Sequence, residues 1–160
     1  MARMARPWLG YKRMRMRKGL AALVAAVALL GAGAALAAYR TGSYAGRTAQ
    51  RLSITFHAGT RSVTGLTYAV RYRCSTGRRF TGSPLRDSLA YRIRYDRFGG
   101  TSRSPSGATR SEVHGTLDRS TATGTVRRTI RINTLLHRPD PAGDERCDSG
   151  TVSFTAHRPR

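Results

Sequence analysis

The chain has 160 residues, which is enough for one domain, and its formal net charge at pH 7 is +21. Beyond residue 37 it has 22 basic residues, all arginine, against 8 acids, a net charge of +14. Such a charge attracts polyanions: nucleic acid, wall polymers or phospholipid head groups. The arginines are scattered without a dense tract, which argues against a specific nucleic-acid partner and is equally typical of arginine used as a general solvated cation.

Residues 1–37 have the order of a secretory signal peptide. A cationic stretch without acids ends at Lys18, and residues 20–38 are uncharged and mostly apolar. Ala35 and Ala37 are the small residues that a signal peptidase reads, so we expect a signal helix that is cleaved before Ala38. The alternative is a retained membrane anchor, because the 19 residues of 20–38 nearly match the roughly 20 that span hydrocarbon. In both cases we expect the rest of the chain to be secreted or in the cell envelope.

Export determines how the two cysteines, Cys74 and Cys147, are used. In an oxidising compartment a single pair most often forms one disulfide, here closing a ring of 74 residues. In the chain-entropy model a bond of this span contributes roughly 4 kcal/mol to stability. No histidines stand at ligand spacing beside these cysteines, so a zinc site is not expected.

The first part of the exported chain has the alternation of β-strands. Residues 38–50 are a lead-in with a candidate edge strand at 44–48, and residues 52–58 alternate apolar and polar side chains. Residues 62–74 are expected to form one long strand. Gly65 within it predicts a bulge that moves the inward face from Val63 to Leu66. Tyr68 and Tyr72 share the parity of Leu66, Val70 and Cys74 and are expected in the core.

The second part contains one uncertain region and one clear hairpin. Residues 75–98 are irregular apart from a strand at 91–95, and residues 99–107 are expected to be a polar loop and a candidate for local disorder. Residues 111–117 and 121–135 predict a hairpin, in which Arg128 falls on the apolar side by parity. Val152, Phe154 and Ala156 alternate in a closing strand.

These elements predict an all-β fold. We expect a single β-sandwich, or a small barrel, over residues 51–158, with about seven or eight mostly antiparallel strands. No amphipathic helix is expected after residue 38.

Two groups of residues resemble metal or catalytic sites. Four acids lie within nine residues, but their spacing fits no EF-hand and two arginines lie among them, so we expect a salt-bridged loop and neither a metal nor a cofactor. The four acids are Asp140, Asp144, Glu145 and Asp148, and the arginines are Arg138 and Arg146. No nucleophile elbow or HExxH motif is present, and Asp148 and Ser149 are expected to cap backbone amides. We therefore expect no catalytic residue; a hydrolase would require Ser149, a histidine and a carboxylate to converge.

The candidate anion-binding residues are Arg71, Arg73, Arg92 and Arg94. They project from strand faces, and if those strands are neighbours the four form a cationic patch suited to phosphate or carboxylate.

Several short motifs resemble a group of small exported proteins of unknown function from high-GC actinobacteria. The motifs are Tyr44-x-Gly46-x-Thr48-x-Gln50, Val70-Arg71-Tyr72-Arg73-Cys74, Phe98, Gly115-x-Leu117, Ala122-Thr123-Gly124-Thr125-Val126 and Cys147-Asp148-Ser149-Gly150-Thr151-Val152. The resemblance spans nearly all of the exported chain, and its most specific part is the cysteine-aspartate-serine-glycine run. It implies a β-sandwich with one disulfide and no established activity, and it supplies no catalytic or ligand residue.

The sequence thus predicts a non-enzymatic secreted or cell-envelope module that binds anionic polymers through arginine-lined strand faces. A structural or protein-interaction domain is the first alternative, marked by an apolar patch or an open sheet edge. A hydrolase is the least favoured.

Overall fold

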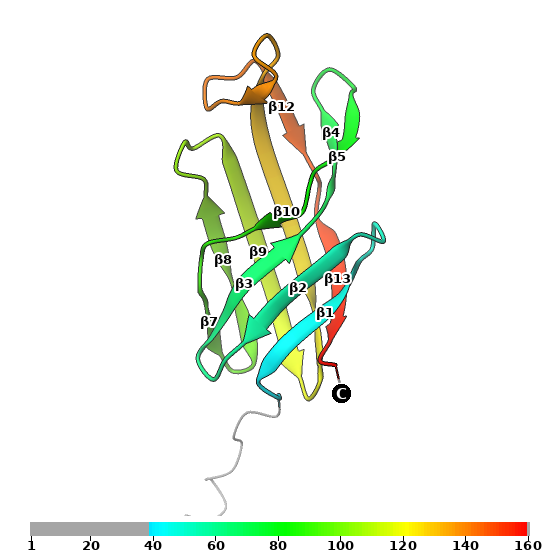
Figure 1. Cartoon of the computed structure of the whole chain (residues 1–160), viewed down its shortest axis with the longest axis vertical. Helices are drawn as coiled ribbons and strands as arrows, with labels where there is room; N and C mark the ends of the chain where they lie inside the picture. Colours follow the sequence, from blue (N-terminus) through cyan, green and yellow to red (C-terminus); the bar gives the residue numbers. More distant parts are fainter. Residues whose placement is uncertain (1–38, 160) are drawn as a thin grey trace, which may run out of the picture. The chain divides into compact units, whose positions relative to one another are not determined.

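The computed structural model describes residues 39–159, and these residues form strands joined by turns (Figure 1). The signal peptide at 1–37 and the apolar segment 20–38 lie outside the described residues. Among residues 39–159 there is no helix long and apolar enough to cross a membrane.

Eight strands form a closed antiparallel barrel, in which each strand pairs with the next along the ring and β10 pairs with β13 to close it. The ring consists of β1 (Gly42–Thr48), β2 (Ser53–Ala58), β3 (Ser62–Tyr68), β7 (Tyr91–Arg94), β8 (Arg97–Arg103), β9 (Thr109–Asp118), β10 (Thr121–Asn133) and β13 (Val152–His157). The all-β class is confirmed. Of the two architectures expected, the pairing forms the small barrel; a sandwich is not confirmed.

Five further strands lie outside the ring: β4 (Arg71–Cys74), β5 (Arg79–Thr81), β6 (Leu85–Arg86), β11 (Arg138–Pro139) and β12 (Glu145–Asp148). Three of them continue the sheet beyond β10 in the order β12-β4-β5. Because β8, β9 and β10 are long enough to run past the barrel, the six strands β8-β9-β10-β12-β4-β5 form an extension at one end of it (Figure 1).

The barrel interior is filled by aromatic and aliphatic side chains. The ring of Phe56 stacks on Tyr44 at 5.2 Å between centroids, and it also contacts Phe98 and Phe154. An eight-stranded barrel is just wide enough to be filled in this way, so the interior is a packed core.

Tyr68 on β3 and Tyr72 on β4 are both buried, as expected. Burial raises the pKa of Tyr72 to about 12.

The strongest patterns in the sequence correspond to real strands. In β13, Val152, Phe154 and Ala156 are buried, and their neighbours in the strand are exposed. In β3, the pairing with β2 shifts by one residue opposite Gly65, whose φ is 61°. Val63 and Leu66 are both fully buried on either side of this shift. The predicted bulge and the predicted change of inward face are therefore confirmed.

A second bulge joins β12 to β13. Thr129 pairs with Asp148 and Val126 pairs with Val152, so two residues of β10 face three residues, 149–151. Gly150, with φ 65°, provides the left-handed conformation that such a bulge requires. The two strands can therefore follow β10 as one interrupted strand, first in the extension and then in the barrel.

Three expectations were wrong. The strand at 44–48 is not an edge strand, because β1 pairs with both β2 and β13. The run 62–74 is two strands: the chain leaves the barrel after Tyr68 and pairs next with β12. The loop expected at 99–107 is mostly strand β8. Glycine suggested a loop there, but Gly99 is glycine because a Cβ would lie 2.4 Å from the carbonyl oxygen of Val113.

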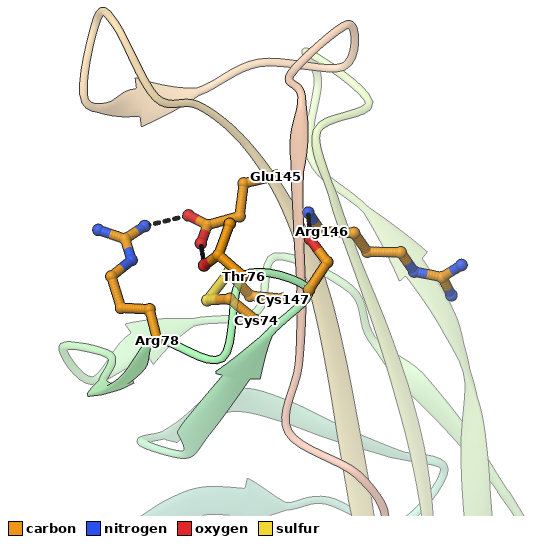
Figure 2. The surroundings of a disulfide bond; sticks show 7 residues. Cys74, Thr76, Arg78, Glu145, Arg146 and Cys147 are labelled. Atoms are coloured by element: carbon orange, nitrogen blue, oxygen red, sulfur yellow. Dashed lines mark hydrogen bonds and ion pairs between the residues drawn. A yellow bond between two sulfur atoms is a disulfide. The ribbon is translucent and has the colours of Figure 1, made fainter.

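The Cys74–Cys147 disulfide is present and links β4 to β12 (Figure 2). The two cysteines are directly opposite in the register, their Cα atoms are 3.8 Å apart, and both are buried. The amide of Ser75 also donates to the carbonyl oxygen of Arg146 at 2.8 Å. This short pairing attaches the β4–β5 hairpin to the rest of the extension.

A buried carboxylate lies beside the disulfide. Glu145 is only 2% exposed, and its carboxylate accepts hydrogen bonds from the hydroxyl of Thr76 and the guanidinium of Arg78. The Arg78 guanidinium also lies over the ring of Phe80, 5.4 Å from the centroid. These contacts come from the β4–β5 hairpin, so they reinforce the attachment made by the disulfide (Figure 2).

We expect replacement of both cysteines, Cys74→Ser and Cys147→Ser, to lower the free energy of unfolding by about 4 kcal/mol, because the unfolded chain is no longer closed into a long ring. Urea unfolding of the oxidised and the cysteine-free chains measures the difference. A loss well under 1 kcal/mol would contradict this role.

The ion pair should be asymmetric. Arg78→Met leaves the buried Glu145 carboxylate without its cation and is expected to cost about 2–3 kcal/mol. Glu145→Gln is expected to cost about 1 kcal/mol, because the side chain of Arg78 is 48% exposed and water can solvate it. Urea unfolding of both single variants and the double variant tests this; the double variant should cost less than the sum. Equal costs for the two single variants would refute the asymmetry.

Candidate anion-binding face

The extension places arginines side by side across its strands. Residues directly opposite each other in a β-ladder point to the same face. One row crosses all six strands through the pairs Arg103–Arg110, Arg110–Thr129, Thr129–Asp148, Asp148–Arg73 and Arg73–Arg79. At about 4.8 Å between neighbouring strands, this row is roughly 24 Å long.

Further arginines lie on the same side, two residues along from members of this row. The eight arginines that share the face are Arg71, Arg73, Arg79, Arg103, Arg110, Arg127, Arg131 and Arg146. We call them the arginine face. Figure 2 shows the alternation on β12: Arg146 points to the opposite side of the strand from Glu145 and Cys147. The disulfide and the buried carboxylate are therefore behind the arginine face.

Two carboxylates also lie on this face. Glu112 pairs with Arg110 at 2.8 Å, and Asp148 pairs with Arg127 at 2.6 Å. Within residues 39–159, the other six arginines of the face have no carboxylate oxygen within 4.0 Å. Eight guanidinium groups against two carboxylates give the face a net charge of +6. Such a density of one sign raises the local concentration of anions.

Asp148 organises the centre of the face. Its carboxylate accepts two hydrogen bonds from Arg127, from Nε at 3.2 Å and Nη2 at 2.6 Å, and one from the amide of Gly150 at 2.8 Å. The Arg127 guanidinium, aided by the Gly150 amide, lowers the pKa of Asp148 below its usual value. Asp148 therefore stays ionised and fixes the position of Arg127.

Ser149 completes the turn between β12 and β13. Its hydroxyl oxygen accepts from the amide of Arg128 at 2.9 Å, and the hydroxyl donates to the carbonyl of Gly150 at 2.8 Å. The expectation that Asp148 and Ser149 cap backbone amides is confirmed. Among the hydrogen bonds within residues 39–159, none joins Ser149 to a histidine.

Two hollows open on the arginine face. The larger, of about 660 Å³, is lined by three arginines of β4 and β5, by Gln50 and by the turn at residues 148–150. Gln50 reaches from the β1–β2 turn to β4, where its Oε1 accepts from the amide of Arg71 at 2.6 Å. The smaller, of about 180 Å³, lies between β9, β10 and β12 and includes Arg110, Arg127 and Arg146.

The structure separates the four arginines expected to form one patch. Arg71 and Arg73 lie on β4, and Arg92 and Arg94 lie on β7. These strands are not neighbours, because β4 pairs with β12 and β5 whereas β7 pairs with β3 and β8. The condition for a single patch is not met; Arg71 and Arg73 instead belong to the arginine face.

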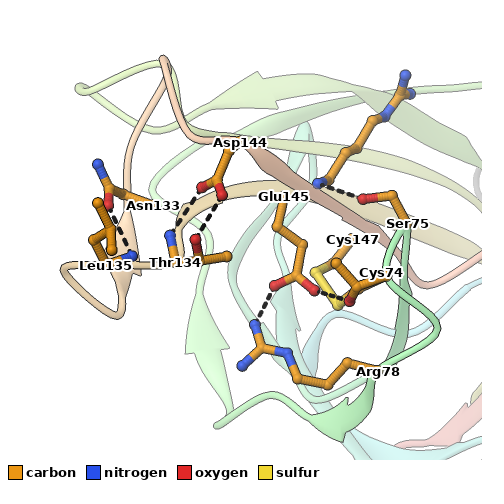
Figure 3. A network of polar contacts seen from close by, with 11 residues as sticks. Cys74, Ser75, Arg78, Asn133, Thr134, Leu135, Asp144, Glu145 and Cys147 are labelled. Atoms are coloured by element: carbon orange, nitrogen blue, oxygen red, sulfur yellow. Dashed lines mark hydrogen bonds and ion pairs between the residues drawn. A yellow bond between two sulfur atoms is a disulfide. The ribbon is translucent and has the colours of Figure 1, made fainter.

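The acidic residues near the C-terminus also have separate partners. Asp140 accepts from the amide of Ala142. Asp144 accepts from the amide and hydroxyl of Thr134 at 2.9 and 2.5 Å, as Figure 3 shows. The pKa of Asp144 is lowered, first by the hydrogen bond from the Thr134 hydroxyl. Arg78 and Arg127, not the expected Arg138 and Arg146, pair with Glu145 and Asp148. Within the described residues, the ligand atoms of Glu145, Cys74 and Cys147 lie close together, as they would around a metal ion. The two cysteine sulfurs, however, are bonded to each other in the disulfide.

Six residues of the face were missed by sequence reasoning: Arg79, Arg103, Arg110, Arg127, Arg131 and Arg146. Part of the signal was present. The second arm of the predicted hairpin, residues 121–135, already put Arg127 and Arg131 on the outward parity, and Arg110 directly precedes its first arm. The expected disulfide implied that the neighbours of the two cysteines lie close together. Arg79 and Arg103 gave no signal, because β5 and most of β8 were not expected.

Comparison with known proteins adds no relative: no protein family matches this chain, and neither a curated protein nor a solved structure matches it. The barrel and the arginine face therefore rest on the residues and contacts described above.

The lowered pKa of Asp148 predicts a pH-dependent contribution to stability. A carboxyl whose pKa is lower in the folded state stabilises the fold fully above its unfolded value, near 3.9, and loses this effect as the pH falls through the folded value. We expect Asp148→Asn to cost about 1–2 kcal/mol at pH 7, and the difference from the native chain to shrink below about pH 4. Urea unfolding between pH 7 and pH 2.5 measures this. Asp118→Asn, on the exposed end of β9, is the control; a difference for Asp148→Asn that does not change with pH would contradict the assignment.

Proposed function

We propose that this chain is an exported, non-enzymatic module of the cell envelope or the extracellular space that binds linear anionic polymers through the arginine face. The observation that supports it is the row of opposite residues that runs from Arg103 to Arg79 across six strands, flanked by further guanidinium groups. A long, open and rigid cationic surface suits a polymer with repeated charges better than a small substrate.

The chemistry of the face favours charge recognition over sequence readout. Arginine forms paired hydrogen bonds to phosphate, sulfate or carboxylate oxygens and is always protonated. The large exposed aromatic side chain in the described residues is Tyr95, which lies in the β7–β8 turn and not on this face. Tyr72 lines the larger hollow but is only 4% exposed, so among the described residues the arginine face offers no exposed ring on which bases could stack. This favours an envelope polymer over nucleic acid.

Export is the second part of the proposal. Its support is the cationic and then apolar order of residues 1–38 together with the disulfide, since an oxidising compartment allows such a bond to persist. We assign no catalytic residue. Ser149, the residue that a hydrolase would need, has its hydroxyl engaged by backbone groups.

A protein-interaction module is the second candidate, and one observation favours it. Leu135 and Leu136 are 89% and 54% exposed in the turn after β10, where the side-chain oxygen of Asn133 accepts from both of their amides. Figure 3 shows the bond to the amide of Leu135. If the exposed leucines form an interface, we expect the chain to associate with itself. The double variant with Leu135→Ser and Leu136→Ser should associate more weakly, and sedimentation equilibrium measures the association of both chains. A chain that is monomeric with and without these substitutions would leave the leucine turn without this role.

Retention on heparin at increasing salt tests the favoured function. We expect neutralising Arg71, Arg73, Arg79 and Arg103 to glutamine to lower the salt concentration of elution markedly. The slope of log affinity against log salt should fall by about one for each arginine that contacts the polymer. The matched control neutralises four exposed arginines outside the face, Arg61, Arg86, Arg92 and Arg94. Both variants lose the same net charge, so equal losses of retention would mean that the face has no special role.

A further inference from the structure

A different basic cluster lies at the other end of the barrel, where the described chain begins and the C-terminus lies (Figure 1). A hollow of about 580 Å³ opens there, and we call it the terminal hollow. It is lined by Arg40, Ser120, His157, Arg158 and Pro159. The lining thus includes two guanidinium groups, an imidazole and a hydroxyl.

Backbone hydrogen bonds hold the two arginines against the turn between β9 and β10. The amide of Arg40 donates to the carbonyl of Arg119 at 2.6 Å, and the amide of Arg158 donates to the carbonyl of Ser120 at 2.8 Å. The hydroxyl of Tyr44, a residue only 1% exposed, donates to the carbonyl of Arg40 at 2.6 Å. Both arginines are therefore attached to the barrel although they lie outside its strands.

The side chains of the terminal hollow are also positioned. The guanidinium of Arg158 lies against Gly42, where a Cβ would be 2.8 Å from Nε, and the φ of 135° at Gly42 is itself one that favours glycine. The imidazole Nδ1 of His157 is 3.3 Å from the hydroxyl oxygen of Thr121. A substituent at residue 42 would displace the guanidinium, so glycine is needed for this arrangement.

The charge of the terminal hollow is not balanced from within the described chain. Among residues 39–159, neither Arg40 nor Arg158 has a carboxylate oxygen within 4.0 Å, and Asp118 at the end of β9 is not part of the lining. One guanidinium satisfies a carboxylate with two parallel hydrogen bonds. Two guanidinium groups with an additional imidazole and hydroxyl provide donors for the larger number of oxygens on a tetrahedral phosphate.

From this arrangement we propose that the terminal hollow binds a phosphate group, presented by a free phosphate ester or by a phospholipid headgroup. Arg40 and Arg158 pair with the phosphate oxygens, and Ser120 and His157 provide the remaining hydrogen bonds. The site is independent of the arginine face, since the two lie at opposite ends of the domain and share no residue.

The test uses the full chain and three probes: inorganic phosphate, glycerol 3-phosphate, and vesicles of phosphatidic acid in phosphatidylcholine. Backbone amide shifts in NMR titrations report where the soluble probes bind, and co-sedimentation reports vesicle binding. The variant is Arg40→Gln with Arg158→Gln, and the matched control is Arg92→Gln with Arg94→Gln. We expect shifts confined to residues around the terminal hollow, and affinity for at least one probe to fall at least tenfold in the variant and under twofold in the control.

The pattern across the probes identifies the source of the phosphate. Binding of glycerol 3-phosphate without vesicle binding indicates a soluble ester, and vesicle binding that exceeds the pure phosphatidylcholine control indicates a headgroup. Saturation by none of the probes, shifts located elsewhere, or equal losses in variant and control would overturn the proposal. Gly42→Ala provides an independent check, because it displaces the Arg158 guanidinium without removing a charge and should also weaken binding. Heparin retention through the arginine face should be unchanged in Gly42→Ala, so the two proposals can fail separately.

Discussion

The pairing of β4 with β12 is the contact on which the arginine face depends. Only two residue pairs form this ladder, and one of them is the disulfide-linked pair Cys74 and Cys147. The other is Arg73 opposite Asp148, which belongs to the row across the face. A two-residue ladder is weak alone, so the covalent bond and the buried Glu145 carboxylate behind it hold the β4–β5 hairpin in place. Without this attachment the face would end at β12.

The strand β10 connects this extension to the barrel. Its first half pairs with β13 and closes the ring, and its second half pairs with β12. The turn at residues 148–150 lies between the two halves, where the extra residue of the bulge is accommodated by Gly150 and the side chains of Asp148 and Ser149 bond to neighbouring amides. The same turn thus fixes Arg127 for the face and carries the chain from the extension into the closing strand.

Sequence reasoning succeeded where a side-chain pattern determines the local structure. The alternation in β13, the bulge at Gly65 and the disulfide were predictable, because period-2 burial, glycine in a strand and a lone cysteine pair each have a direct physical meaning. The arrangement of strands was less accessible. Arg71 and Arg92 both project outward from strands, but only the ring order shows that β4 and β7 are not neighbours.

Two of the wrong predictions concern β7 and β8: a loop was predicted where glycines lie in β8, and β7 was predicted to continue through Tyr95. Gly99 and Gly100 suggested a flexible loop, whereas Gly99 lies in β8 at a close approach to β9 that leaves no room for a Cβ. Tyr95 was expected to continue the strand at 91–95, but it lies in the turn between β7 and β8, where it is 97% exposed and has a φ of 50°. Whether Gly99 lies in a strand and whether the chain turns at Tyr95 both depend on which strand pairs with β8, and the local sequence does not specify that pairing.

We propose that the disulfide completes the arginine face and so supports its binding of anionic polymers. The most direct measurement compares heparin affinity against salt for the oxidised chain and for the chain with Cys74→Ser and Cys147→Ser. Hydrogen exchange on β9 and β13 serves to confirm that the barrel of the cysteine-free chain is folded. We predict a shallower salt dependence without the bond, because the arginines of β4 and β5 are no longer held beside those of β12. An unchanged salt dependence with an intact barrel would contradict the claim.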